Sequence, residues 1–169
     1  MLQWAEFEVA ASELATLGRE RFERFGFLFV GTVRKDGGPR VNPVEAYVVD
    51  GHLVLNMMWR SRKALDLLRD PRIYLHTPIT DRLGAPGEFK AAGRAVPIED
   101  PALWEAAADV IEATIDWRPP KRSHFFTVAV DRAAFITYDP DGTQHVRRWR
   151  RDQPTVEVRV ACPGCADPP

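Results

Sequence analysis

The amino-acid sequence predicts a mainly β protein of the α+β class, built as a small barrel of about six antiparallel strands with two or three peripheral helices. The chain has 169 residues, 45% of them hydrophobic, which is enough for one compact domain with its own core. Most strand-like segments follow one another with tight turns between them, as in an antiparallel meander. The helical segments are few and do not alternate strictly with strands, which favours a barrel over a doubly wound parallel sheet.

The strand-like segments are rich in aromatic and β-branched residues and are separated by turn signals. They cover residues 26–33, 40–50, 52–59, 72–79, 89–100 and 123–139. The last of these is either one strand or two strands that join at Asp131. Pro43 cannot donate a ladder hydrogen bond, so the second strand is expected at a sheet edge or bulged at that point. Gly93 predicts a bulge or a close backbone approach in the fifth strand.

Three segments have helical patterns. Residues 12–25 carry an approximate apolar stripe, with Ser12 as the candidate N-cap. Residues 61–70 form a short amphipathic segment that is ended by a proline. Residues 100–117 begin with Asp100 as N-cap and have a proline in the first turn, so a third helix is predicted there.

Charge and hydropathy exclude several classes of function. Lys and Arg number 23 against 24 Asp and Glu, for a net charge of −1, so no global positive field points to nucleic acid. The apolar runs are too short to cross a bilayer, and the acidic, amphipathic N-terminal segment is unlike a signal peptide. We therefore expect a cytoplasmic protein with no nucleic-acid or membrane partner.

No metal centre or nucleophilic site is predicted. Cys162 and Cys165 form one CxxC pair, which is half of a structural zinc site and could be completed only if a dimer pooled two pairs. The simpler interpretation is a frayed tail rich in Pro and Gly. The four histidines show no HExxH spacing, and the sequence contains no GxSxG motif.

The start of the second helix is unusually basic. Residues 60–63 read "RSRK", although the helix macrodipole already places partial positive charge at a helix N-terminus. A bound phosphate would remove this conflict, because the free N–H groups, the Ser61 hydroxyl and the side chains of Arg62 and Lys63 would converge on it. The alternative is that Arg60, Arg62 and Lys63 form a solvated surface face, with or without pairing to Asp66 and Asp70. Local sequence leaves both interpretations open.

This segment, "SRKALDLLRDPR", follows "DGGPRVNPV" and "DGHLVLN". In that order the three segments resemble the pyridoxamine 5'-phosphate oxidase-like superfamily of FMN-binding split β-barrels, over residues 25–139. The resemblance implies a split β-barrel that forms a homodimer, with the cofactor at the subunit interface. It implies a single flavin-binding domain over residues 1–150, followed by a flexible C-terminal tail over residues 151–169.

Carried over by position, the resemblance also implies which residues bind the cofactor. Arg62 and Lys63 would contact the FMN phosphate, with Ser61 in support. The second strand, through Asn42, Pro43, Val44 and Glu45, would lie along the ring system. The end of the third strand would contribute Asn56 and Met57 to the ring or ribityl groups, and Met58 and Trp59 would close the pocket. Core packing is the alternative for the residues of the third strand.

The implied function is an FMN-dependent oxidoreductase that transfers hydride or electrons to or from an unknown small molecule, with catalytic residues unknown. The second strand offers only Arg40 where the oxidases carry a basic pair, so oxidation of pyridoxamine phosphate itself is not expected. One alternative is a coenzyme F-420 (deazaflavin)-dependent reductase, in which residues 145–151, "HVRRWRR", would hold an acidic cofactor tail or simply be solvated. Another is a non-catalytic flavin or heme carrier or sensor, with His76 or His124 as an axial ligand.

Overall fold

The computed structural model describes residues 2–81, 84 and 86–161. The helices are α1 (Trp4–Ala10), α2 (Ser12–Phe25), α3 (Arg62–Arg69) and α4 (Pro101–Ile115). The strands are β1 (Phe27–Val33), β2 (Pro39–Val49), β3 (His52–Met57), β4 (Arg72–His76), β5 (Glu88–Pro97), β6 (His124–Tyr138), β7 (Gln144–Arg150) and β8 (Val156–Val160).

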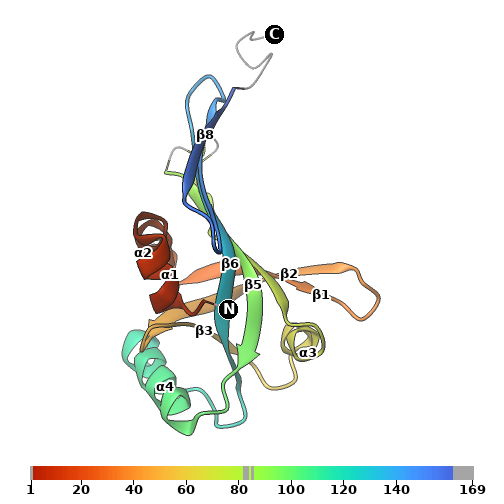
Figure 1. Cartoon of the computed structure of the whole chain (residues 1–169). Coiled ribbons are helices and arrows are strands. Elements are labelled where there is room, and N and C mark those ends of the chain that lie inside the picture. The colour runs from red at the N-terminus through yellow and green to blue at the C-terminus, as the bar shows by residue number, and fades with distance from the viewer. Residues whose placement is uncertain (1, 82–83, 85, 162–169) are drawn as a thin grey trace.

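The strands form a closed antiparallel barrel. They are hydrogen-bonded in the order β3-β2-β1-β4-β5-β6, and a further pairing of β3 with the start of β6 closes the ring. The second half of β6 leaves the barrel and pairs with β7, which pairs with β8, so that a ribbon projects from the barrel (Figure 1). The predicted mainly β, split-barrel fold class is therefore confirmed, with four peripheral helices where two or three were expected.

The barrel interior and the helices on its flank share one apolar core. Trp4 and Phe7 of α1 are completely buried and form ring contacts with Phe22, Phe89 and Trp149. The sequence prediction missed α1, because a helix of seven residues is too short to show a clear period and depends on tertiary packing for its stability. The expected N-cap of α2 was also wrong: Ser12 is the first residue of the helix, and the N-cap is Ala11.

The predicted irregularities of the sheet are confirmed. Pairing of β2 with β3 begins only at Ala46, so Pro43 lies in a stretch of β2 that is paired with β1 alone. The β5–β6 register shifts between Ala92 and Gly93, and Asp131 is the extra residue on the β6 side, so β6 is one continuous bulged strand. A Cβ atom at Gly93 would lie 1.9 Å from the carbonyl oxygen of Ala129, which explains the need for glycine.

Several boundaries differ from the sequence interpretation, and two of them concern the candidate site and the tail. The third strand ends at Met57, so Met58 and Trp59 lie in the turn before α3. Residues 156–160, which were expected to belong to a flexible tail, form β8. The division of the chain into a domain and a tail at residue 150 stays a prediction. Cys162 and Cys165 lie outside the described residues. None of the helices in the described part of the chain has the length and apolar character needed to span a membrane.

Candidate functional site

The turn between β3 and α3 presents the basic segment. The Ser61 amide donates to the carbonyl of Met58 at 3.0 Å, and Arg60 adopts a left-handed conformation with φ of 52°. Ser61 is the N-cap, as predicted, but its side chain makes no capping hydrogen bond. Its Oγ is buried and has no hydrogen-bond partner among the described residues. The first turn of α3 therefore keeps a hydroxyl and free N–H groups available to a ligand.

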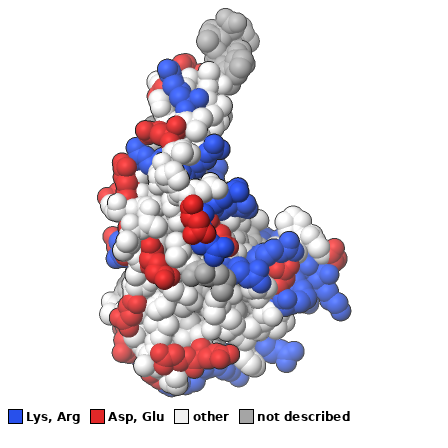
Figure 2. Space-filling view, in the orientation of Figure 1, with Lys and Arg blue, Asp and Glu red and all other residues white. Residues whose placement is uncertain are grey.

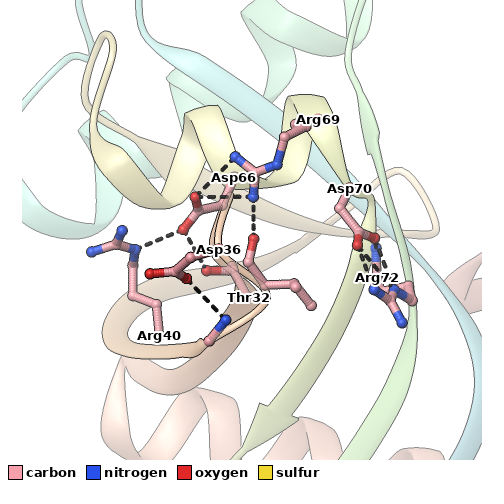
Figure 3. Close-up of polar contacts among 9 residues, drawn as sticks. Thr32, Asp36, Arg40, Asp66, Arg69, Asp70 and Arg72 are labelled. Atoms are coloured by element: carbon pink, nitrogen blue, oxygen red, sulfur yellow. Dashed lines mark hydrogen bonds and ion pairs between the residues drawn. The ribbon is translucent and has the colours of Figure 1, made fainter.

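Neither acidic residue of this helical segment neutralises the basic turn. The buried Asp66 accepts hydrogen bonds from Arg40 Nε at 2.6 Å and Thr32 Oγ1 at 3.1 Å, and it pairs with Arg69 at 3.3 Å (Figure 3). Asp70 pairs with Arg72 at 2.6 Å. The side chains of Arg60 and Arg62 have no ion pair within the described ranges of the chain. The pairing of the basic turn with Asp66 and Asp70 is thus not formed, while Arg60 and Arg62 are exposed, as the alternative of a solvated face expects.

The Lys63 side chain connects α3 to the middle of β2. Its Nζ donates to the carbonyl of Pro43 at 3.3 Å. Burial lowers the pKa of Lys63, while the charge of the nearby Glu45 acts in the opposite direction. Burial, together with the same Glu45 carboxylate 3.4 Å away, raises the pKa of Tyr47 to about 12. Lys63, Pro43 and Glu45 therefore lie together, on two elements that the resemblance assigns to one cofactor site.

Two more buried polar atoms lack partners near the end of β3. Asn56 Oδ1 and His124 Nε2 are both without a hydrogen bond among the described residues. His124 opens β6, where it is paired with Met57 of β3, and its ring stacks on Trp59 with centroids 4.9 Å apart. Burial lowers the pKa of His124 and so favours the neutral ring, in which one nitrogen is an acceptor, over the imidazolium.

The remaining predicted site residues differ in their exposure. The side chains of Val44 and Met57 are buried in the barrel core, so only their backbone atoms remain available to a ligand. Met58 is 73% exposed and Trp59 is 52% exposed. The assignment of Ser61, Arg62, Lys63, Val44, Glu45, Asn56, Met57 and Met58 to a cofactor stays a prediction.

Other candidates from the sequence are engaged elsewhere. Arg40 points to Asp66 and not to the start of α3. His76 Nε2 lies 2.8 Å from the buried carboxylate of Glu88, which also pairs with Lys90 at 2.6 Å. His145 pairs with Asp139 at 2.8 Å.

Sequence reasoning did not identify the stack of His124 on Trp59 or the role of Asp66 as a buried acceptor. His124 had been considered only as a heme ligand. Its neighbour in space is 65 positions earlier in the chain, and the contact depends on the β3–β6 pairing that closes the barrel. The available signal for Asp66 was an aspartate within a basic helical segment. That signal indicated pairing with the basic turn, whereas the structure pairs Asp66 with Arg40 and Arg69.

Charge is distributed unevenly over the molecule. Lys and Arg gather over the end formed by α3 and the β1–β2 hairpin, and Asp and Glu gather mainly on the side of α2 and α4 (Figure 2). The basic end includes α3, whose first turn carries the basic segment, and its charge would attract an anionic ligand there.

Solved structures with similar folds include proteins of several kinds. PhzG from Burkholderia lata 383, in complex with tetrahydrophenazine-1-carboxylic acid, has 16% identity and a TM-score of 0.62, over 94% of this chain and 93% of its own. A heme binding protein from Mycobacterium smegmatis has 18% identity and a TM-score of 0.63 over 81% of this chain, which spans 57% of that protein. HutZ, the heme storage protein from Vibrio cholerae, has 15% identity and a TM-score of 0.54, over 72% of this chain and 89% of its own.

At these identities the similarity establishes the fold alone. No curated protein matches the chain. The family model of pyridoxamine 5'-phosphate oxidase matches residues 17–148, which include every strand of the barrel and all of α3. The chain therefore belongs to the pyridoxamine 5'-phosphate oxidase-like family of split-barrel proteins.

Proposed function

We propose that the protein is an FMN-dependent oxidoreductase that acts as a homodimer, with the cofactor phosphate bound at the start of α3. When bound, the flavin ring supplies hydride or electron transfer to or from a small-molecule substrate. The protein supplies the binding site, the orientation of the cofactor and the exclusion of water.

The observation that supports this proposal most directly is the uncompensated basic turn. The two acidic residues of the segment are paired with other arginines, and the Ser61 hydroxyl is buried without a partner. A phosphate would accept hydrogen bonds from that hydroxyl and from the helix N–H groups, and its charge would offset Arg62 and Lys63. The residues present therefore fit the phosphate of a flavin mononucleotide.

The surroundings of the turn fit the rest of such a ligand. Asn56 and His124 each offer a buried polar atom without a partner, and Trp59 presents a half-exposed ring. Lys63 is held against β2 by the Pro43 carbonyl, which keeps its charge close to the turn. These side chains would bind and orient a planar heteroaromatic ligand.

A second copy of the chain would cover the neighbouring outer face of the barrel. Phe29 and Pro43 are directly opposite each other on β1 and β2, and Val41 lies two residues from Pro43 on the same face. All three are exposed. This apolar face borders the Lys63 contact, which supports a cofactor site at a subunit interface.

The test is titration of the purified protein with FMN, followed by absorption spectroscopy and calorimetry. The substitution Lys63→Ala should weaken FMN binding about tenfold to a hundredfold, because it removes a charge-assisted contact to the phosphate. Lys35→Ala, at an exposed lysine in the β1–β2 turn, is the matched control and should leave affinity unchanged. If Lys63→Ala binds FMN as tightly as Lys35→Ala does, the phosphate does not bind at the start of α3. A molecular mass of one chain in sedimentation equilibrium would contradict the homodimer.

Two alternative ligands remain candidates on the same fold. Coenzyme F-420 also carries a phosphate, and parallel titrations with FMN and with the deazaflavin would show which one is bound. Heme is favoured by one specific observation, the free and buried Nε2 of His124. A Soret band that appears on heme addition and is lost in His124→Ala would support a heme carrier or sensor, whereas turnover of a reductant with bound flavin would support the oxidoreductase.

A further inference from the structure

A second strongly basic surface lies on the outer face of β4, β5, β6 and β7, and its lining extends to the end of β1 and the start of β2. It forms a groove of about 750 Å³ whose lining includes five arginines. An adjoining hollow of about 580 Å³ shares part of this lining and is also lined by Arg148 of β7. The arginines of the groove are Arg72, Arg94, Arg132, Arg150 and Arg151.

The strand register brings several of these charges together. Arg132 of β6 is directly opposite Arg150 of β7, and Arg148 lies two residues from Arg150 on the same face. Arg72 of β4 is directly opposite Arg94 of β5. Directly opposed residues of neighbouring strands have their side chains about 5 Å apart, and like charges in such pairs are destabilising. The sheet therefore carries two opposed pairs of arginines on one surface.

Acidic side chains offset two of the five arginines of the groove, Arg151 and Arg72. Asp131 and Asp152 lie 3.7 Å and 3.6 Å from Arg151. Arg72 is occupied by Asp70 outside the groove. Within the described residues, the side chains of Arg94, Arg132, Arg148 and Arg150 have no ion pair or hydrogen bond to the protein.

Some arginines outside the groove are neutralised. Arg147 is adjacent to Arg148 in sequence but is on the other face of β7, where it pairs with both Glu13 and Glu157. Arg118, near the end of α4, pairs with three acidic residues. On β7, therefore, the arginine of one face is paired with acidic residues, whereas those of the groove face are not.

We propose that this groove binds a small organic polyanion with at least two carboxylate or phosphate groups. Guanidinium groups bind both kinds of anion in bidentate geometry, and the opposed arginines of β6 and β7 would hold one anionic group between them. Tyr74 and Ala92, which are in register with Arg132, form an apolar floor for the carbon skeleton of the ligand. The site shares no residue with the turn at α3, so its ligand is separate from the proposed FMN phosphate.

The experiment uses two probes, inorganic pyrophosphate and citrate, titrated into the full-length protein by calorimetry at constant ionic strength. At least one probe should bind, and comparison of the two distinguishes phosphate from carboxylate ligands. Arg132→Gln and Arg150→Gln should each weaken that binding about tenfold to a hundredfold, because each removes a charge-assisted contact. The control Arg122→Gln, at an exposed arginine outside the groove, should leave it unchanged.

The variant Lys63→Ala separates this proposal from the one for FMN. It should weaken FMN and leave binding of the probe in the groove intact, whereas the double variant Arg132→Gln/Arg150→Gln should do the reverse. The double variant should also unfold at the same or a higher temperature than the parent when no anion is present, because the repulsion between opposed arginines is removed. The proposal is overturned if neither probe binds, if the double variant binds the probe with the affinity of the parent, or if only Lys63→Ala abolishes binding.

Discussion

Replacing Asp66 with Asn tests the network that holds α3 against the barrel. Asp66 lies on α3, is 4% exposed, and receives a hydrogen bond from Arg40 of β2 and another from Thr32 of β1. Arg69 of the same helix pairs with Asp66 and also donates to the carbonyl of Val33. The carboxylate thus joins one helix to two strands, and Asn removes its charge while it keeps nearly the same volume.

The size of the effect follows from the burial of the partners. Breaking a fully buried ion pair costs about 3–5 kcal/mol, because an unpaired charge is left inside the protein. The side chains of Arg40 and Arg69 are 24% and 38% exposed, so water partly solvates them once Asp66 is neutral. Asn also keeps a carbonyl that can accept from Thr32. We therefore expect the free energy of unfolding to fall by about 2–3 kcal/mol in Asp66→Asn.

The pH dependence gives this prediction a second readout. Burial alone would raise the pKa of Asp66, but the hydrogen bonds from Arg40, Thr32 and Arg69 outweigh it and hold the pKa below its usual value. A folded-state pKa below the unfolded value contributes stability above the unfolded pKa, and this stability is lost as the pH falls through the folded pKa. The difference between the parent protein and Asp66→Asn should therefore be full at neutral pH and should shrink below about pH 4.

The assay is urea unfolding, monitored by circular dichroism at several pH values between neutral and acidic. Glu23→Gln, at an exposed carboxylate of α2, is the control and should change the free energy of unfolding by less than about 0.5 kcal/mol. A loss below about 1 kcal/mol in Asp66→Asn, or a loss that does not change with pH, would refute the assignment of Asp66 as the charged link between α3 and the barrel.

Two further predictions concern the backbone of the barrel and of α4. Gly93→Ala should lower the free energy of unfolding by about 3 kcal/mol or more, because its Cβ would lie 1.9 Å from the carbonyl oxygen of Ala129. Thermal unfolding measures this loss. A variant as stable as the parent would show that the bulge relaxes to accept the methyl group. Asp100→Ala should cost about 1 kcal/mol, because the Asp100 side chain accepts a hydrogen bond from the Ala102 amide at 3.0 Å. Urea unfolding is sufficient to detect that loss, and recovery of stability in Asp100→Ser would attribute it to the cap.

Features that depend on a few adjacent residues were predictable from the sequence. Pro43 restricts its strand to a position with one partner, because proline has no N–H to donate. Gly93 was expected at a bulge or close approach, and Asp100 at the start of a helix, for equally local reasons. The family resemblance rested on the basic turn before α3, which is also a local motif.

Only the tertiary structure decided which charged groups pair. Three basic residues lie within four positions of Asp66 in sequence, and of these only Arg69 pairs with it. Its closest partner is Arg40 on another element, 26 positions away. The stack of His124 on Trp59 and the opposed arginines of β6 and β7 depend likewise on strand register. Local conformation follows from the covalent chemistry of each residue. The pairing of charged side chains follows from closure of the barrel, because closure brings distant segments together. It therefore decides which charges are buried and which remain free for a ligand.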